Sequence, residues 1–119
     1  MVPDRRTTGR EGEDLAAAVL ESHGYRILDT NFRSPFGEID IVAEESGCLV
    51  FVEVKRRRGS SFGASLEAID ARKRQHIIRS AQVYLKKNRC ADRRIRFDVV
   101  GIDGETIRVI RHAFGEERG

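Results

Sequence analysis

The sequence predicts a single α/β domain in which a mixed β-sheet of about five strands is flanked by helices. Three observations lead to this fold class. Segments rich in β-branched residues alternate with two stretches of helical periodicity, turn residues separate them, and 119 residues suffice for one modest core. A hydrophobic fraction of 39% and a charged fraction of 34% are typical of a soluble globular protein. The expected domain covers residues 1–119, with frayed ends near 1–8 and 116–119.

The elements follow one another in the order α-β-β-β-α-β-β. The first helix is expected to start at a cap formed by Thr7 or Thr8 and to reach about His23, with Gly24 as its stop signal. A turn over residues 34–37 follows the first strand, and an Asp-Gly turn separates the last two strands. Strands are expected over 25–33, 39–43, 48–55, 95–102 and 106–114, and the second helix over 66–88.

Charged residues interrupt the two apolar runs of the central hairpin at Asp40, Glu53 and Lys55. An even-length loop that places Ala43 opposite Cys48 makes Asp40 and Glu53 diagonal neighbours on one sheet face, with Cβ atoms about 7–8 Å apart. An odd-length loop or a bulge would break this register. The other face of the hairpin is then wholly apolar and consists of Ile39, Ile41, Ala43, Cys48, Val50, Val52 and Val54.

Two carboxylates that converge beside a lysine suit a hard divalent cation such as Mg²⁺ or Mn²⁺. Asp40 and Glu53 would hold the ion, and Lys55 would orient a water molecule or stabilise the charge that develops on a phosphate. Such an arrangement favours metal-assisted hydrolysis of a phosphodiester. The alternative is a pair of surface salt bridges at an exposed end of the sheet.

The residues Gly37-Glu38-Ile39-Asp40 and Phe51-Val52-Glu53-Val54-Lys55 resemble the Asp…Glu-x-Lys core of the restriction-endonuclease-like superfamily, and are similar to archaeal Holliday junction resolvases. More narrowly, residues 9–114 resemble the YraN family of small bacterial proteins, which is described as endonuclease-like. The resemblance implies a restriction-endonuclease-like core, a Mg²⁺ or Mn²⁺ cofactor and a possible homodimer. It also implies that Glu13 is a further metal ligand; the alternative is an ordinary charge at a helix start.

Two more residues are candidates for supporting roles. Glu38 would support the metal ion by contacting the residues that bind it, or through a water molecule. Lys73 falls in the middle of the apolar stripe of the second helix, where it either extends its ammonium group to the edge of the core or reaches a carboxylate or phosphate. Asp98 lies in a strand and is expected to have a structural role as a partner of Arg96 or Lys73.

The net charge of +3 conceals a strong asymmetry. Residues 55–96 hold 14 Lys and Arg against 3 Asp and Glu, whereas the rest of the chain holds 8 against 16. A basic segment that begins at the proposed site suits the backbone of a nucleic acid, because phosphate neutralisation supplies most of the affinity. The candidate contacts to nucleic acid, which is expected to be DNA, are Arg56, Arg57, Arg58, Arg72 and Arg79.

Composition also excludes several classes of function. No apolar run approaches the length of a membrane span, and the polar start of the chain does not resemble a signal peptide. Cys48 and Cys90 are predicted to be reduced thiols of a cytoplasmic protein. Besides the nuclease, two alternatives stay open: a nucleic-acid-binding module that does not cut, and a protein-interaction module that uses the charge asymmetry.

Overall fold

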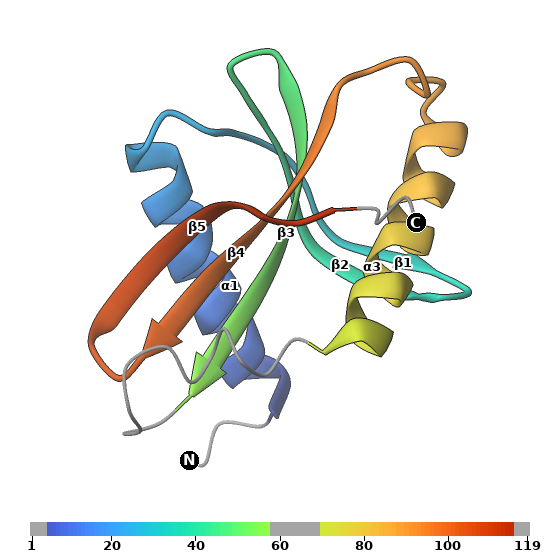
Figure 1. The fold of residues 1–119 in the computed structure, drawn as a ribbon. Coiled ribbons are helices and arrows are strands. Elements are labelled where there is room, and N and C mark those ends of the chain that lie inside the picture. Colours follow the sequence, from blue (N-terminus) through green and yellow to red (C-terminus); the bar gives the residue numbers. More distant parts are fainter. Residues whose placement is uncertain (1–4, 58–69, 116–119) are drawn as a thin grey trace.

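The computed structural model describes residues 5–57 and 70–115. It confirms the predicted fold class and the order of the elements (Figure 1). One five-stranded sheet has the strand order β1-β2-β3-β4-β5, in which β3 and β4 are parallel and all other neighbours are antiparallel. The elements are α1 (Arg5–Ser22), β1 (Arg26–Ser34), β2 (Gly37–Glu45), β3 (Cys48–Arg57), α3 (Ala71–Lys87), β4 (Ile95–Asp103) and β5 (Thr106–Phe114).

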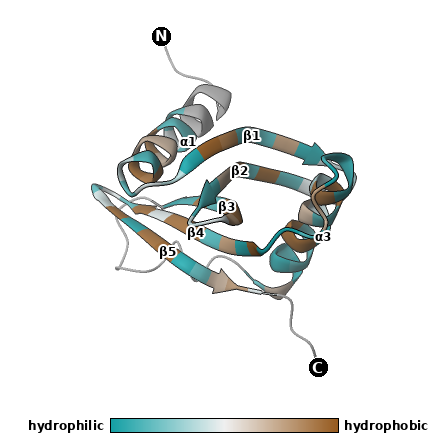
Figure 2. Cartoon of the chain, turned by 90° about the horizontal axis from the view of Figure 1, so that it is seen from above, coloured by the Kyte–Doolittle hydropathy of each residue, from teal (hydrophilic) through white to brown (hydrophobic). Residues whose placement is uncertain are grey.

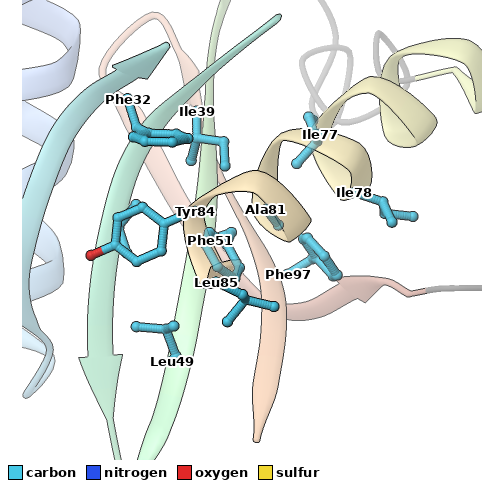
Figure 3. Close-up of a cluster of buried hydrophobic side chains, with 11 residues drawn as sticks. Phe32, Ile39, Leu49, Phe51, Ile77, Ile78, Ala81, Tyr84, Leu85 and Phe97 are labelled. Atoms are coloured by element: carbon cyan, nitrogen blue, oxygen red, sulfur yellow. The ribbon is translucent and has the colours of Figure 1, made fainter. Parts of the chain in front are cut away.

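The two helices cover opposite faces of the sheet, as the view from above shows (Figure 2). On one face, Ala16 and Leu20 of α1 pack on a cluster that includes Ile41, Val50 and Val52. On the other face, α3 covers a second cluster rich in aromatic rings (Figure 3). Apolar residues on both faces remove the central strands from water, which is the main source of the fold's stability. The second cluster contains Phe32, Ile39, Val42, Leu49, Phe51, Ile77, Ile78, Ala81, Tyr84, Leu85 and Phe97.

Helix α1 ends as the sequence predicts. Gly24 has a φ of +92°, which places it in the left-handed region that favours glycine. The amide of Tyr25 donates to the carbonyl of Leu20 at 3.0 Å, and the amide of Gly24 donates to the carbonyl of Glu21 at 3.1 Å. This is a Schellman motif, completed by the burial of both Leu20 and Tyr25 in one cluster. The start differs from the prediction: α1 begins at Arg5, so the backbone of the predicted caps, Thr7 and Thr8, is already helical.

The predicted register of the central hairpin is wrong by two residues. Glu45, and not Ala43, is paired with Cys48. The connection is a two-residue turn at Ser46 and Gly47, whose φ values of 51° and 76° are those of a type I′ turn. Such a turn matches the twist of the flanking strands, so β2 continues through the two glutamates that the sequence placed in the loop. Because the shift is even, the paired residues from Ile41 to Glu45 and from Cys48 to Val52 keep the faces that the predicted register gave them.

Helix α3 is shorter than predicted at its start. Asp70 is its N-cap, and the Asp70 carboxylate accepts a hydrogen bond from the backbone amide of Lys73 at 2.9 Å. Of the predicted helix, residues 66–69 therefore lie before the cap and outside the described part of the chain. Neither described helix is long and apolar enough to cross a membrane. Cys48 and Cys90 are both free thiols, as predicted.

Asp98 is a structural residue, in agreement with its predicted role. It is fully buried and accepts a hydrogen bond from the Tyr25 hydroxyl at 2.7 Å. The Arg96 guanidinium donates to both of its carboxylate oxygens at 2.8 Å, and the backbone amide of His112 donates at 2.9 Å. Arg96 also pairs with Glu45. The network ties the end of α1 to β4 and β5, and it satisfies the buried charge.

A candidate metal centre at the end of the β2–β3 pairing

The predicted site lies where β2 and β3 separate. The regular pairing of the two strands reaches Ile41 and Val52, so the next positions are Asp40 and Glu53. Here the Asp40 carboxylate accepts a hydrogen bond from the backbone amide of Val54 at 2.8 Å. A side chain therefore takes the place of a backbone acceptor at this point. The predicted diagonal pairing of Asp40 and Glu53 is not part of the regular ladder, but the two side chains interact with each other just beyond its last pair.

The same interruption changes the apolar pattern of β2. Ile39 was expected on the face of Ile41, but it belongs to the cluster under α3, whereas Ile41 belongs to the cluster under α1. The alternation of faces is thus broken at Asp40, between two buried isoleucines. Both anchor the strand in the core, and Asp40 is held between them at the edge of the protein interior.

Glu53 is the most enclosed acid of the site, with 4% of its surface exposed. Its Oε1 atom lies 3.6 Å from the ammonium nitrogens of both Lys55 and Lys73. Lys55 comes from the same strand, and Lys73 comes from the first turn of α3. Among the described residues, Glu53 Oε2 is the buried side-chain oxygen that has no hydrogen-bond partner. An unpaired buried carboxylate oxygen costs free energy unless a cation or a water molecule satisfies it.

Two further acids, Glu13 and Glu38, gather beside Asp40. Carboxylate oxygens of Glu13, Glu38 and Asp40 all lie within 4.8 Å of one another. Glu13 belongs to α1, and the other two belong to β2. All three side chains are partly exposed. Helix α1 therefore delivers a third acid to the strands, and Glu38 belongs to this acidic cluster as closely as Glu13 does.

Burial raises the pKa values of Asp40, Glu53 and Glu13. Desolvation is the main cause for Asp40, followed by the charge of Glu53, and together they raise the pKa of Asp40 to about 7. Burial also raises the pKa of Glu53, against the opposing effect of Lys73 and Lys55. For Glu13, burial is again the first cause of a raised pKa, and the hydrogen bond to Asn31 acts in the opposite direction. The charges that act on Asp40 and Glu13 are negative, so these two carboxylates lack a nearby positive charge.

A hard divalent cation fits this donor set. The ligand atoms are carboxylate oxygens, which Mg²⁺ and Mn²⁺ prefer. One of them, Glu53 Oε2, is buried without a partner, and Asp40 is ionised only at the cost of repulsion. The lysines by themselves do not remove this mismatch, because both lie on the Oε1 side of Glu53.

The raised pKa of Asp40 predicts how metal-free stability depends on pH. Between its unfolded value of 3.8 and its folded value of about 7, the folded protein holds a proton that the unfolded chain has lost. Stability contributed by this group is therefore lost as pH rises through that window, by roughly 4 kcal/mol in total. We expect Asp40→Asn to unfold at a higher temperature than the native chain at pH 8, and at the same temperature near pH 4. Thermal unfolding in EDTA measures this difference.

Asp29→Asn is the control, because Asp29 is exposed and accepts a local hydrogen bond from Thr30 that asparagine retains. Its effect is expected to be the same at both pH values. A stability difference between Asp40→Asn and the native chain that does not grow from pH 4 to pH 8 would contradict the burial argument.

The structure places only three of the five arginine side chains that are predicted to contact nucleic acid. Arg56 is exposed beyond the lysine of β3, and Arg72 and Arg79 are exposed on α3. Arg57 belongs to β3, but its side chain is outside the described part, and Arg58 lies outside it altogether. The structure thus brings Glu13, Glu38, Asp40, Glu53, Lys55 and Lys73 together, with the exposed arginines on the neighbouring α3 and at the end of β3.

Sequence reasoning missed two contributors near the site. Asn31 of β1 has a φ of 55° and hydrogen-bonds to Glu13. Asparagine is one of the few residues that adopt this backbone region readily, which is the one signal that was available. Phe36, in the turn between β1 and β2, has 41% of its surface exposed. A large aromatic residue in a tight turn two positions before Glu38 was a second signal.

Fold and site together define an α/β domain that gathers carboxylates and lysines where two strands of a mixed sheet separate. Comparison with known proteins then places the chain in a family. The model of the uncharacterised protein family UPF0102 matches residues 12–102, and the chain belongs to this family, which is the YraN family that the sequence resembles.

Relatives match over nearly the whole chain. A UPF0102 protein of Persephonella marina is 46% identical over 106 residues, which cover 89% of this chain and 91% of the relative. One of Syntrophotalea carbinolica is 48% identical over 102 residues, covering 86% and 83%. One of Dehalococcoides mccartyi is 40% identical over 121 residues, covering 98% and 100%. These relatives establish the family, whose own description names no activity.

Proposed function

We propose that the chain is a metal-dependent nuclease that hydrolyses phosphodiesters in DNA, with branched or junction DNA as the expected substrate. One observation carries the proposal. Glu53 is buried with an unpaired oxygen, between two lysines and beside an aspartate whose pKa is raised to about 7. A purely structural ion pair has no use for such an arrangement, whereas functional sites commonly tolerate it.

Asp40, Glu53 and Glu13 are the proposed ligands of a Mg²⁺ or Mn²⁺ ion. Glu38, whose carboxylate lies within 4.8 Å of those of Glu13 and Asp40, would support it. When bound, the ion would act as a Lewis acid that lowers the pKa of a bound water molecule and neutralises phosphate charge. Lys55 holds its ammonium group beside Glu53, where it would orient the attacking water or stabilise the charge that develops on the phosphate. Lys73 would contribute a second positive charge from α3.

The substrate's backbone is proposed to lie along the basic residues. Arg56 continues β3 beyond Lys55, and Arg72 and Arg79 face solvent on α3. Exposed arginines contact phosphates independently of sequence, so shape and charge would select the substrate more than base identity. A homodimer would place two such sites on the two symmetric strands of a junction. Arg57 and Arg58 are proposed contacts as well.

The test is a cleavage assay of the purified chain with labelled duplex, single-stranded, flap and four-way-junction DNA. We expect cutting in Mg²⁺ or Mn²⁺ and none in EDTA, and the panel identifies the preferred structure. Binding in EDTA should weaken steeply with added salt, because phosphate contacts release counterions. Salt-sensitive binding with no cutting in either metal would favour a nucleic-acid-binding module on the same fold. If the chain neither cuts nor binds any of these DNAs, the result would contradict both the nuclease and the nucleic-acid-binding module.

A further inference from the structure

The turn between β1 and β2 presents an aromatic ring to solvent beside the proposed site. Phe36 is 41% exposed, although most other large apolar residues of the described chain are buried in the two clusters. It lies two residues before Glu38 and four before Asp40. At the rise of an extended strand, these separations are about 7 and 13 Å. An exposed ring at this distance from the acidic cluster is within reach of a nucleic acid whose backbone occupies the site.

The turn is held rigidly, so the exposure of the ring is built into the fold. Ser34 Oγ accepts the backbone amide of Phe36 at 3.0 Å and donates to the carbonyl of Gly37 at 3.2 Å. The same oxygen lies 2.8 Å from the hydroxyl of Ser80, which is fully buried in α3. Because Ser34 uses its own hydrogen for Gly37, the Ser80 hydroxyl is the donor in this contact. Gly37 has a φ of +139°, a conformation that side chains disfavour. If Phe36 served only the hydrophobic core, the turn would not need to hold its ring in an exposed position.

A cation completes the aromatic surface. The Arg79 guanidinium of α3 lies over the Phe36 ring, 5.6 Å from its centre. Arg33, paired with Glu38 across β1 and β2, is exposed on the same hairpin, and His76 of α3 approaches Gly37. The ring therefore has one cation over it, Arg79, and a second exposed arginine, Arg33, comes just before the turn. Arginine beside an exposed aromatic ring is the combination that proteins use to stack unpaired bases and hold their phosphates.

We propose that Phe36 and Arg79 form a stacking site for an unpaired base of DNA. The site rests on the proposed function: it would hold a base that is flipped out, single-stranded or at a branch point, about two to four nucleotide steps from the phosphodiester at the acidic cluster. It supplies a preference for DNA structure without reading base identity, since every base has a face that can stack. A fully paired duplex offers no free base face and would not occupy it.

The absence of tryptophan from the chain makes a direct test available. Phe36→Trp introduces the single tryptophan of the chain at the proposed site and keeps an aromatic ring there. Leu28→Trp is the matched control, because Leu28 is 40% exposed on β1 but near the end of that strand that pairs with Glu44, away from the turn. Each protein is titrated in EDTA with single-stranded, flap and blunt duplex oligonucleotides. Anisotropy of labelled DNA measures binding independently.

We expect single-stranded and flap DNA to quench the fluorescence of Phe36→Trp, blunt duplex to quench it little, and Leu28→Trp to stay unchanged at equal saturation. The affinity of variants without the introduced tryptophan for labelled DNA gives a second readout. Phe36→Ala and Phe36→Leu should bind flap DNA about tenfold more weakly, and Phe36→Tyr should bind like the native chain. Leucine separates stacking from simple apolar contact, since it keeps apolar surface but has no ring.

Tight binding without selective quenching would overturn the stacking site, as would equal quenching by blunt duplex. Affinities for flap DNA that do not change in Phe36→Ala would overturn it too. Because these titrations contain no metal ion, they are independent of cleavage. Selective quenching together with no cutting in Mg²⁺ or Mn²⁺ would support the stacking site and overturn the nuclease, whereas no binding to any DNA would overturn both.

Discussion

Replacing Glu53 by glutamine is expected to abolish metal-dependent cleavage while leaving the protein folded. Glutamine keeps the length of the side chain but removes the negative charge that a divalent cation requires of its ligand. Loss of the ion's contribution should reduce the cleavage rate by roughly 10²–10³-fold or more. Burial of Glu53 raises the pKa of its carboxyl group, and one of its oxygens is unpaired. A neutral amide is therefore not expected to lower the unfolding temperature at pH 8.

The measurement pairs a cleavage time course with thermal unfolding of the same preparations. Glu21→Gln is the matched control, since Glu21 is exposed on α1 and the substitution is identical. Its rate and its unfolding temperature should equal those of the native chain. A second variant, Lys55→Met, removes the ammonium group on the same strand and should also reduce the rate. Undiminished cleavage by Glu53→Gln would place the catalytic ion, or the activity itself, elsewhere.

Replacing Asp98 by alanine is expected to destabilise the fold more than any other single substitution considered for this chain. The variant removes four hydrogen bonds at once, from the Tyr25 hydroxyl, from two nitrogens of Arg96 and from the backbone amide of His112. It also leaves Arg96 with one carboxylate partner in place of two, Glu45. Breaking a buried charge pair costs about 3–5 kcal/mol, which lowers the unfolding temperature of a domain of this size by roughly 10–20 °C.

Asp92→Ala provides the comparison, because Asp92 is exposed between α3 and β4. It should leave the unfolding temperature nearly unchanged. Asp98→Asn is informative as an intermediate, since it keeps the shape of the side chain and can still accept hydrogen bonds from its neighbours but loses the charge opposite Arg96. Differential scanning calorimetry of the three variants gives the order directly. Equal unfolding temperatures for Asp98→Ala and Asp92→Ala would show that the network does not hold the fold together.

Most of the secondary structure follows from local sequence signals. The bounds of β1, β4 and β5 lie within one residue of their predicted positions, because β-branched runs are bounded there by turn residues. Gly24 marks the end of α1 for a reason that is also local: its backbone conformation favours glycine. The starts of both helices were predicted less well. For α3, the periodic pattern of the sequence continues upstream of Asp70, but Asp70 is the N-cap, so α3 begins at Ala71.

The hairpin register shows where local reasoning stops. Glu44 and Glu45 read as loop residues, but both belong to β2, where Glu45 pairs with Arg96 and Arg111. These partners come from strands about fifty residues or more later in the chain, so no local pattern announces them. With the glutamates in the strand, the turn shrinks to Ser46 and Gly47, and every pair in the hairpin moves by two positions.

The sequence by itself determined the family, the α/β class and the chemical identity of the acids and lysines, because periodicity and charge within a strand are local properties. It also determined which face of the hairpin carries Val42, Leu49 and Phe51, since a shift of two residues preserves side-chain parity. Only the tertiary structure decided that Asp40 and Glu53 meet just beyond the last regular pair of β2 and β3, and that Lys73 comes within 3.6 Å of Glu53. It alone decided that Phe36 is exposed beside Arg79. Those contacts depend on how α3 packs on the sheet, and packing is set by many distant side chains at once.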